Sequence, residues 1–472
     1  MNRRAKIVCT IGPATASPER LRGLAEAGMD VARLNFSHGT HADHERTYQL
    51  VRETAEAVGR PIGILADLQG PKIRLGRFAA PPVEWRTGDH VVITAEQVLG
   101  TAERVSCTYP KLPAEVGSGD RLLIDDGKLA VEVTGVAGPD ISCLVIEGGE
   151  VSDHKGVSLP NVALSVPALC DKDVIDLRLA LRLGVDLVAL SFVRAAADIK
   201  GIQDVMAAEG VRRPVLAKLE KPEAVTQLSA IVDAFDGLMV ARGDLGVELP
   251  LQDVPLVQKR AVQLCRERAK PVIVATQMLE SMVDSSRPTR AEASDVANAV
   301  LDGADALMLS AETSIGRHPI EAVTTMARIV TASESRPEPP PSRGRIDPPR
   351  PQEEAIALGA VMVGRAVGAK ALVAFTLSGM GARLLAAQRP SLPVLAFTPD
   401  PRVRSQLALV WGVETFLEPA PADTDEMTAH VDRAMLELGR ADAGDAVVVV
   451  AGTPPGTEAS TNTLRVHRLG QG

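Results

Sequence analysis

The sequence predicts an α/β protein: a (β/α)8 barrel with an inserted small β-barrel lid domain and a C-terminal α/β domain. Short runs of Val, Ile and Leu recur about eight times in the first and third quarters of the chain, each followed by a helical stretch. The runs lack polar alternation, which is typical of parallel strands buried on both faces. Polar side chains follow the runs rather than precede them, so a barrel would gather them at its C-terminal mouth.

The barrel is expected over residues 1–70 and 167–335, on both sides of the insertion. Eight βα units close a barrel of this type, so the number of runs favours a barrel over an open sheet. The runs predict strands at residues 6–11, 31–34, 62–66, 187–192, 215–219, 237–240, 272–275 and 306–309.

Residues 71–166, which separate the third run from the fourth, have a different sequence pattern. They contain short segments at 90–94, 121–124 and 129–133, with Gly and Asp turns between them. This pattern is typical of a small β domain. Because the insertion follows a strand at the catalytic mouth, we expect the domain to act as a lid.

A proline-rich, charged stretch over residues 336–352 follows the last barrel helix. Such a composition cannot pack a core and predicts a stiff, solvated linker. Beyond it, apolar runs at 371–375, 394–397 and 446–450 alternate with helical patterns. We therefore expect a second α/β unit over 353–472; the family resemblance described below implies that it serves effector binding and oligomerisation.

The composition limits the classes of function. The chain has 472 residues, is 45% hydrophobic and carries a formal charge of -9. That charge argues against broad binding to nucleic acid or a membrane surface, which needs a basic face. No apolar run approaches the roughly 18 residues of a membrane span, and no signal peptide is evident, so we expect a cytoplasmic protein. The five cysteines are scattered without CxxC spacing, which supports neither disulfides nor a zinc cluster.

A lysine and two carboxylates lie at the ends of two neighbouring runs. Because side chains alternate along a strand, Lys218 and Glu220 point the same way and Leu219 points toward the packing layer. Asp244 follows the next run. A cation beside an acid pair is typical of a site for a metal ion and a phosphate group.

Several sequence blocks resemble those of the pyruvate kinase family, and they occur in that family's order. The resemblance extends to the C-terminal residues 461–466 (TNTLRV). It implies phosphoryl transfer from phosphoenolpyruvate to ADP, giving pyruvate and ATP in glycolysis, with Mg²⁺ or Mn²⁺ and usually in a homotetramer. The blocks are 31–39 (VARLNFSHG), 67–74 (DLQGPKIR), 216–221 (LAKLEK), 239–248 (MVARGDLGVE), 275–282 (ATQMLESM) and 288–303 (PTRAEASDVANAVLDG).

The resemblance also implies a role for individual residues, and their chemistry suits a reaction in which negative charge moves between oxygens. Glu220 and Asp244 would hold the divalent ion, and Lys218 would face the phosphoryl group and the enolate oxygen. Thr276, with Ser310 nearby through water, would lie on the path of the proton that reaches the enolate carbon. The remaining assignments are Arg33 as a clamp on the phosphoryl group, Gly243 in substrate binding, and Asn35, Arg74 and Lys155 at the nucleotide phosphates.

Two positions depart from the potassium-requiring members of the family, which carry Glu in place of Lys72 and Thr in place of Leu68. The ammonium of Lys72 could supply the positive charge itself. We therefore expect an enzyme that does not require K⁺. Asn35, Ser37 and Asp67, which resemble K⁺ ligands, would then orient one another.

A glycine-rich loop after a C-terminal strand resembles the family's effector loop. Leu377, Met380 and Gly381 remove much of the hydroxyl and basic complement found in sugar-phosphate-activated relatives. Thr376, Ser378 and Gly379 could still receive a phosphorylated activator at a helix start. We expect a weak or altered effector response.

Plainer interpretations of these residues exist. Lys218 and Glu220 could form a strand-end salt bridge, Asp244 a turn, and the Thr276 and Ser310 hydroxyls could satisfy local backbone groups. Two rival functions are a Mg²⁺-dependent enolpyruvate lyase or mutase and a catalytically inactive effector sensor. The inserted lid argues against the first. The second would require the loss of a site residue, and all are present.

Overall fold

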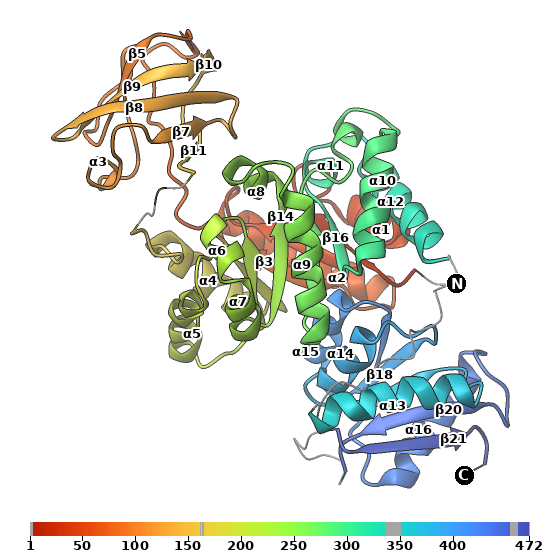
Figure 1. The fold of residues 1–472 in the computed structure, drawn as a ribbon. Coiled ribbons are helices and arrows are strands. Elements are labelled where there is room, and N and C mark those ends of the chain that lie inside the picture. The colour runs from red at the N-terminus through yellow and green to blue at the C-terminus, as the bar shows by residue number, and fades with distance from the viewer. Residues whose placement is uncertain (1–2, 161, 163–164, 336–350, 454–460, 472) are drawn as a thin grey trace.

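Eight parallel strands form a closed barrel in the computed structural model, which describes residues 3–160, 162, 165–335, 351–453 and 461–471 (Figure 1). The strands are hydrogen-bonded in the order β1-β16-β15-β14-β13-β12-β3-β2. Each of the eight predicted runs overlaps one of them, so the prediction of a barrel is confirmed. The strands are β1 (Lys6–Thr10), β2 (Val31–Asn35), β3 (Gly63–Asp67), β12 (Leu187–Leu190), β13 (Val215–Leu219), β14 (Gly237–Ala241), β15 (Val272–Ala275) and β16 (Ala306–Leu309).

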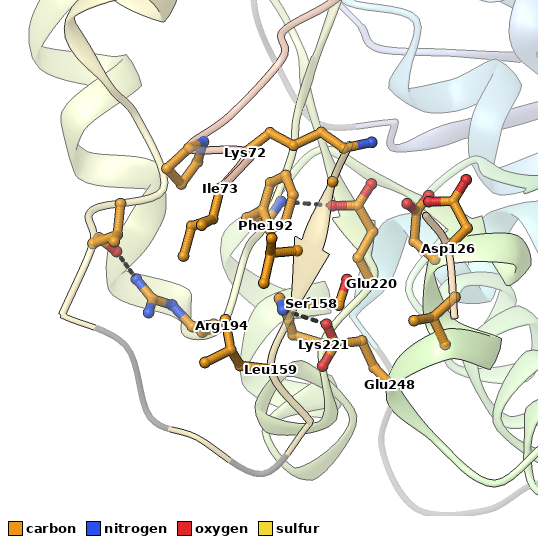
Figure 2. A pocket seen from close by; sticks show the side chains of 16 residues that line it. Lys72, Ile73, Asp126, Ser158, Leu159, Phe192, Arg194, Glu220, Lys221 and Glu248 are labelled. Atoms are coloured by element: carbon orange, nitrogen blue, oxygen red, sulfur yellow. Dashed lines mark hydrogen bonds and ion pairs between the residues drawn. The ribbon is translucent and has the colours of Figure 1, made fainter. Parts of the chain in front are cut away.

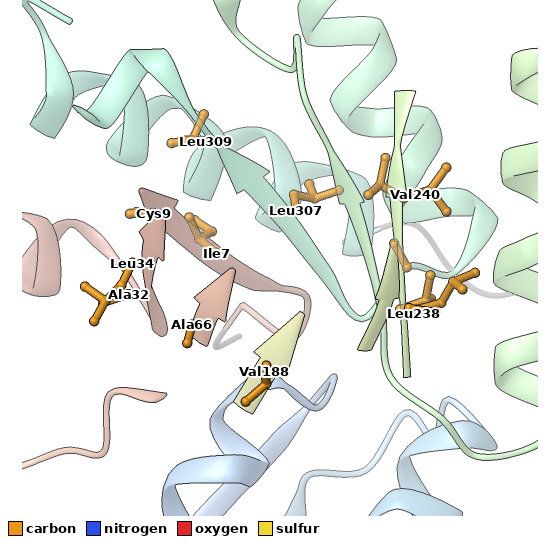
Figure 3. Close-up of a cluster of buried hydrophobic side chains, with 14 of the residues drawn as sticks. Ile7, Cys9, Ala32, Leu34, Ala66, Val188, Leu238, Val240, Leu307 and Leu309 are labelled. Atoms are coloured by element: carbon orange, nitrogen blue, oxygen red, sulfur yellow. The ribbon is translucent and has the colours of Figure 1, made fainter. Parts of the chain in front are cut away.

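Alternate residues of these strands enter two separate cores. Ile7, Cys9 and their counterparts on other strands point away from the barrel axis and join the core shared with the helices (Figure 3). The intervening Val8, Met239 and Met308 pack inside the barrel. Both cores are buried, which explains why the strand sequences lack polar alternation.

The barrel helices begin and end at recognisable capping residues. Thr40 and Thr289 each form a capping box with the acid three residues later, and Gly303 ends a helix with a left-handed backbone. The helices are α1 (Pro18–Ala27), α2 (His41–Ala57), α4 (Asp171–Leu183), α5 (Ile199–Ala208), α6 (Pro222–Thr226), α7 (Leu228–Ala234), α8 (Arg242–Glu248), α9 (Val254–Glu267), α10 (Arg290–Asp302), α11 (Ala311–Ser314) and α12 (Pro319–Glu334), with the short 3₁₀ turns η1 (Ala196–Asp198) and η2 (Glu280–Val283).

The inserted β domain projects beyond one end of the barrel (Figure 1). It has its own core, which includes Trp85, Ile93 and Val131. Its strands pair as an open six-stranded sheet, β11-β7-β8-β9-β5-β6, and a two-stranded sheet, β10-β4, rather than as one closed barrel. The elements are β4 (Val83–Trp85), β5 (His90–Thr94), β6 (Arg104–Ser106), α3 (Leu112–Glu115), β7 (Arg121–Ile124), β8 (Leu129–Ala137), β9 (Asp140–Glu147), β10 (Gly149–Val151) and β11 (Val157–Ser158).

A five-stranded sheet forms the C-terminal domain, with strand order β19-β18-β17-β20-β21. The predicted α/β unit is confirmed, although the sequence analysis missed β19 and the antiparallel edge strand β21. Most of the linker predicted at 336–352, namely residues 336–350, lies outside the described residues. The elements are α13 (Gln352–Ala366), β17 (Leu372–Phe375), α14 (Met380–Ala387), β18 (Val394–Thr398), α15 (Pro401–Gln406), η3 (Leu407–Leu409), β19 (Val413–Leu417), α16 (Thr424–Glu437), β20 (Ala446–Ala451) and β21 (Thr463–Arg468).

The lower end of the barrel is joined to the C-terminal domain through a buried carboxylate. Oδ1 of Asp305, just before β16, accepts hydrogen bonds from Arg389 Nη1 and from the backbone N–H of Trp411, both at 3.2 Å. The Arg389 guanidinium also lies 4.8 Å from the centre of the Trp411 ring. None of the described helices is long and apolar enough to cross a membrane.

Replacing Asp305 with Ala should destabilise the protein by about 3–5 kcal/mol, because it leaves the buried Arg389 charge without its partner. The matched control is Asp284→Ala, which removes an ion pair to Arg317 whose two side chains are each 77% exposed. That change should cost only about 0–1 kcal/mol. Calorimetric melting of both variants checks the prediction, and equal melting temperatures would contradict it.

Candidate active site

A pocket lies between the inserted domain and the C-terminal mouth of the barrel (Figure 2). Asp126 and residues 156–159 line it from the inserted domain. Glu220 and Asp244 line it from the barrel, at the ends of neighbouring strands. Of the polar residues expected at one mouth, Glu220 and Asp244 line this pocket. Arg33, Lys218, Thr276 and Ser310 are not part of its lining, and Lys218 reaches it through the contact with Glu220.

Lys218 is the cation at the centre of the site. Its side chain is 12% exposed, and its Nζ lies 2.7 Å from Glu220 Oε1, 2.8 Å from Ser191 Oγ and 3.5 Å from Asp67 Oδ1. Burial lowers the pKa of Lys218, but Asp67, Glu220 and Asp244 outweigh this effect and raise the pKa above its ordinary value. The ammonium group thus stays charged at any working pH.

The two acids differ in how they are held. Glu220 is almost fully buried, and its Oε2 accepts the backbone N–H of Phe192 at 2.8 Å (Figure 2). Asp244, in the first turn of α8, is open to the cleft and makes no hydrogen bond or ion pair with the described residues. Partial removal from water inside the cleft raises the pKa of Asp244 to about 6, and the like charge of Glu220 acts in the same direction.

Two hard-oxygen ligands side by side suit Mg²⁺ or Mn²⁺. Glu220 is fixed by its hydrogen bonds, whereas the Asp244 carboxylate keeps both oxygens available. The two carboxylates line the same pocket at the ends of neighbouring strands, and Asp244 makes no ion pair with any residue that the structure describes, so the donor set fits a divalent cation. In the described part of the chain, no group of three or more His, Cys, Asp or Glu side chains is arranged to hold a metal ion.

Arg33 is held by Asp67 on the adjacent strand. Its Nε and Nη2 both lie 2.7 Å from Asp67 Oδ2, and its Nη1 donates to Thr10 Oγ1 at 3.0 Å. Asp67 is 1% exposed. Because the guanidinium is fixed on two sides, it enters the cleft in one orientation.

The two hydroxyl residues behave differently from each other. Thr276 Oγ1 accepts the backbone N–H of Gly243 and donates to the carbonyl of Ala275, both at 2.7 Å. The plainer interpretation, a hydroxyl that satisfies local backbone, therefore applies in part to Thr276. Ser310 Oγ is buried and has no hydrogen-bond partner among the described residues, so this oxygen remains available.

The expected nucleotide residues are spread over the barrel and the inserted domain. Asn35 Oδ1 accepts the backbone N–H of Ser37 at 3.2 Å. Arg74 donates to the carbonyl of His154 at 2.9 Å, and Lys155 Nζ lies 3.0 Å from Asp125 Oδ1. Arg74 and Lys155 thus both contact residues of the inserted domain. A rotation of that domain relative to the barrel would move both side chains.

Some oxygens of the expected monovalent-cation region face donors of the chain, whereas Asp67 Oδ1 is buried without a hydrogen-bond partner in the described part of the chain. Leu68 is buried, and its carbonyl accepts the Ser191 hydroxyl at 2.7 Å. Asp67 faces Arg33 and Lys218, as described above. Lys72 lines the same pocket as Asp244. Its positive charge partly offsets the effects that raise the pKa of the Asp244 carboxyl.

Sequence reasoning missed several residues of the site. Ser191 was counted inside an apolar run, yet it bridges Lys218 to the Leu68 carbonyl. Lys221 pairs with Glu248 at 2.6 Å in the pocket wall (Figure 2). The signal that could have identified Ser191 was its position at the end of a barrel strand, the same criterion that identified Glu220.

The expected effector loop borders a second cavity, in the C-terminal domain. Gly379 has φ +80° and precedes α14, and its N–H is accepted by Thr376 Oγ1 at 2.8 Å. Thr376, Ser378 and Gly381 line the cavity together with apolar side chains that include Phe375, Phe397 and Met427. The loop hydroxyls thus border a cavity of mixed lining, which also includes the charged side chains of Arg268, Glu353 and Glu418.

The fold and the site together define a class of protein. The fold is a closed parallel barrel with an inserted β domain, and the site holds a lysine among three carboxylates with an arginine beside them. The class is that of barrel enzymes with a charged site at the C-terminal mouth, whose residue types suit a divalent cation and a phosphorylated anion.

The chain belongs to the pyruvate kinase family. The barrel domain of that family matches residues 2–323, and its alpha/beta domain matches residues 354–467. Membership makes the protein a phosphotransferase and implies phosphoenolpyruvate and ADP as substrates. It supports the kinase interpretation over the lyase or mutase alternative.

Known relatives match over nearly the whole chain. A pyruvate kinase of Mycobacterium intracellulare is 58% identical over 471 residues, covering 100% of this chain and 99% of the relative. One of Corynebacterium glutamicum is 57% identical over 474 residues, covering 100% and 98%. The crystal structure of a pyruvate kinase from Cryptosporidium parvum has a TM-score of 0.92 at 36% identity, covering 99% of this chain and 96% of that one.

Binding of Mn²⁺ to the metal-free protein should weaken as the pH falls below about 6. Asp244 titrates near that pH, above its usual 3.8, so at lower pH a metal ion must displace a proton. The affinity should fall by about tenfold per pH unit below 6 and level off above about 7. Electron paramagnetic resonance of free Mn²⁺ measures this. Asp244→Asn should bind weakly with a flattened slope, and a constant wild-type affinity from pH 7 to pH 5 would contradict the assignment.

Proposed function

We propose that phosphoenolpyruvate and ADP react at the mouth of the barrel, around Lys218, Glu220 and Asp244. The observation that carries this proposal is the 2.7 Å contact between Lys218 Nζ and Glu220 Oε1, with Asp244 open to the same cleft. The transferred phosphoryl group carries its charge on peripheral oxygens, so catalysis depends mainly on cations held in position.

Glu220 and Asp244 hold the divalent cation in this proposal, Mg²⁺ or Mn²⁺. The ion, when bound, neutralises charge on the substrate oxygens and completes its coordination with oxygens from substrate and water. Glu220 is the fixed ligand, because its hydrogen bond to Phe192 N–H sets its orientation. Asp244 adjusts to the ion from the start of α8.

Arg33 and Lys218 bind the phosphoryl group from two sides. Arg33 is held by Asp67 and Thr10, so it meets the group without a loss of side-chain entropy. Lys218 faces the oxygen that becomes the enolate when the phosphorus–oxygen bond breaks. Its raised pKa keeps the ammonium charged while negative charge develops on that oxygen.

The enolate carbon then takes a proton, and Thr276 and Ser310 lie on its path. A hydroxyl is a poor acid by itself, so a water molecule ordered by these side chains delivers the proton. Ser310 supports this role because its buried Oγ has no hydrogen-bond partner among the described residues. Gly243 donates its backbone N–H to Thr276 Oγ1, and in this proposal it lies next to the bound substrate.

The nucleotide phosphates meet Asn35, Arg74 and Lys155 when the inserted domain closes as a lid. Arg74 and Lys155 belong to the base of that domain, so its rotation would bring two cations toward the ADP phosphates. An effector, if phosphorylated, would bind at the Thr376 to Gly381 loop, and the response should be weak because the loop lacks basic side chains. We also propose a cytoplasmic homotetramer, on the family's usual assembly.

Lys218→Met should lower kcat by about 10³-fold or more, because it removes the charge that faces the developing enolate. A coupled assay that follows pyruvate formation from phosphoenolpyruvate and ADP with Mg²⁺ measures the effect. Lys200→Met, which removes an exposed lysine on α5, is the control and should keep wild-type turnover. Wild-type turnover by Lys218→Met would refute the proposed site.

We also propose that the enzyme works without K⁺. Asp67 already faces Arg33 and Lys218, the Leu68 carbonyl accepts Ser191, and the ammonium of Lys72 lies in the same pocket. Fixed positive charges therefore already face the oxygens that a monovalent cation would use: Asp67 Oδ1, which has no hydrogen-bond partner among the described residues, lies 3.5 Å from the Lys218 ammonium.

Turnover of the wild-type enzyme should change by less than about twofold when KCl replaces tetramethylammonium chloride at equal ionic strength, since Lys72 supplies the charge. Lys72→Glu should become dependent on K⁺, because a carboxylate there favours a bound cation. Steady-state kinetics of both proteins in the two salts checks this. A tenfold or greater activation of the wild type by K⁺ would overturn the proposal.

A further inference from the structure

The turn that carries Thr276 has a backbone that its own sequence disfavours. Thr276 has φ +67° and Gln277 has φ +53°, both in the left-handed region. For a β-branched residue such as threonine this conformation costs about 1–3 kcal/mol. Neighbouring groups must therefore hold the turn in place.

Two charged side chains hold this turn, one at each end. Arg242 donates to the carbonyls of Thr276 at 2.9 Å and Gln277 at 3.3 Å, and it pairs with Asp295 at 2.6 Å. At the other end, Glu312 Oε1 accepts the backbone N–H of Leu279 at 3.1 Å. The strained conformation is therefore fixed by hydrogen bonds on both sides.

Glu312 also holds the second hydroxyl residue. Its Oε2 accepts the backbone N–H of Ser310 at 2.6 Å, so its two oxygens join the loop after β15 to the loop after β16. The side chain is 0% exposed and forms no ion pair with any described residue. Burial raises its pKa, so the carboxylate is costly to keep there. Its two backbone contacts are the compensation that the structure provides.

We propose that Glu312 is the positioning residue that sets the distance between Thr276 and Ser310, and thereby the site of the water that protonates the enolate. Glu312 does not touch the substrate. This inference rests on the proposed proton path, and it adds the group that aligns that path. It concerns the protonation step, because Arg33 and Lys218, which bind the phosphoryl group in the proposed function, lie on other strands and are held by Asp67 and Ser191 rather than by Glu312.

The variant Glu312→Gln tests this proposal with almost no change in side-chain shape. One carboxylate oxygen becomes an NH₂ group, which faces a backbone N–H and cannot accept its hydrogen bond. One of the two loops then loses its anchor. A displacement of about 1 Å in a reacting geometry costs on the order of 10²-fold in rate.

The protonation step can be measured apart from phosphoryl transfer. In D₂O, with Mg²⁺ and inorganic phosphate in place of the transferred group, the enzyme should exchange the methyl hydrogens of pyruvate. A C–H bond breaks to give the enolate and a C–D bond forms from a solvent deuteron, which nuclear magnetic resonance detects. Glu312→Gln should slow this exchange and kcat by about 10- to 100-fold, while KM for phosphoenolpyruvate stays within about threefold.

Glu280→Gln is the matched control, because Glu280 is an exposed carboxylate on the neighbouring η2. It should exchange and turn over like the wild type. Ser310→Ala separates the two proposals: if this variant keeps normal exchange, the proposed proton path is wrong. If Ser310→Ala slows exchange but a folded Glu312→Gln does not, only the role of Glu312 is wrong.

A second variant keeps the test decisive if Glu312→Gln does not fold, as judged by its melting temperature. Arg242→Lys releases the opposite end of the same turn, because an ammonium cannot bond both carbonyls and Asp295 in the guanidinium geometry. It should produce the same selective loss of exchange over phosphoenolpyruvate binding. Wild-type exchange by folded Arg242→Lys would show that the turn needs no charged anchor, and would overturn the proposal.

Discussion

The attraction between the Lys218 ammonium and the carboxylates around it is the interaction on which the site depends. Three acids, Asp67, Glu220 and Asp244, share the mouth of the barrel, and removing them from water without a cation would be prohibitive. Lys218 contacts two of them, Arg33 neutralises Asp67, and Asp244 is left open to the cleft. Asp244 is thus the one of these three acids that makes no ion pair with the residues described, while the two cations Lys218 and Arg33 are already held in position.

Parallel strands explain why charges from distant parts of the chain meet. Each strand is apolar along its length because one face packs on helices and the other fills the barrel. Only the residues at and beyond its C-terminal end are free to be polar. The short helix α8 begins directly after β14 and α11 begins one residue after β16, so Asp244 and Glu312 lie within one turn of a strand end. Rigid strands therefore fix the Cα positions, and hydrogen bonds fix the side chains.

The same geometry determines which features could be predicted from the sequence. The barrel strands were found because buried parallel strands are continuous apolar runs, and the charged residues were found because they interrupt those runs at their ends. The strand β21 was missed because it is an exposed edge with half-polar composition, and Ser191 because a hydroxyl hardly interrupts an apolar run. The role of Glu312 depends on which two N–H groups it accepts, and a contact between separate loops leaves no trace in local sequence.

Buried charges, rather than apolar packing, hold the catalytic loops, and the reason is directional. Apolar packing resists compression but does little to define orientation, whereas a carboxylate that accepts two N–H groups fixes both distance and angle. The φ of +67° at Thr276 requires such control, since the relaxed backbone would turn the hydroxyl elsewhere. Burying the Glu312 carboxylate costs free energy, as does the strained backbone at Thr276, so the protein bears both costs to hold this turn. If the proposed proton path operates, aligning a water molecule with a planar enolate gains more from this rigidity than the protein loses in stability.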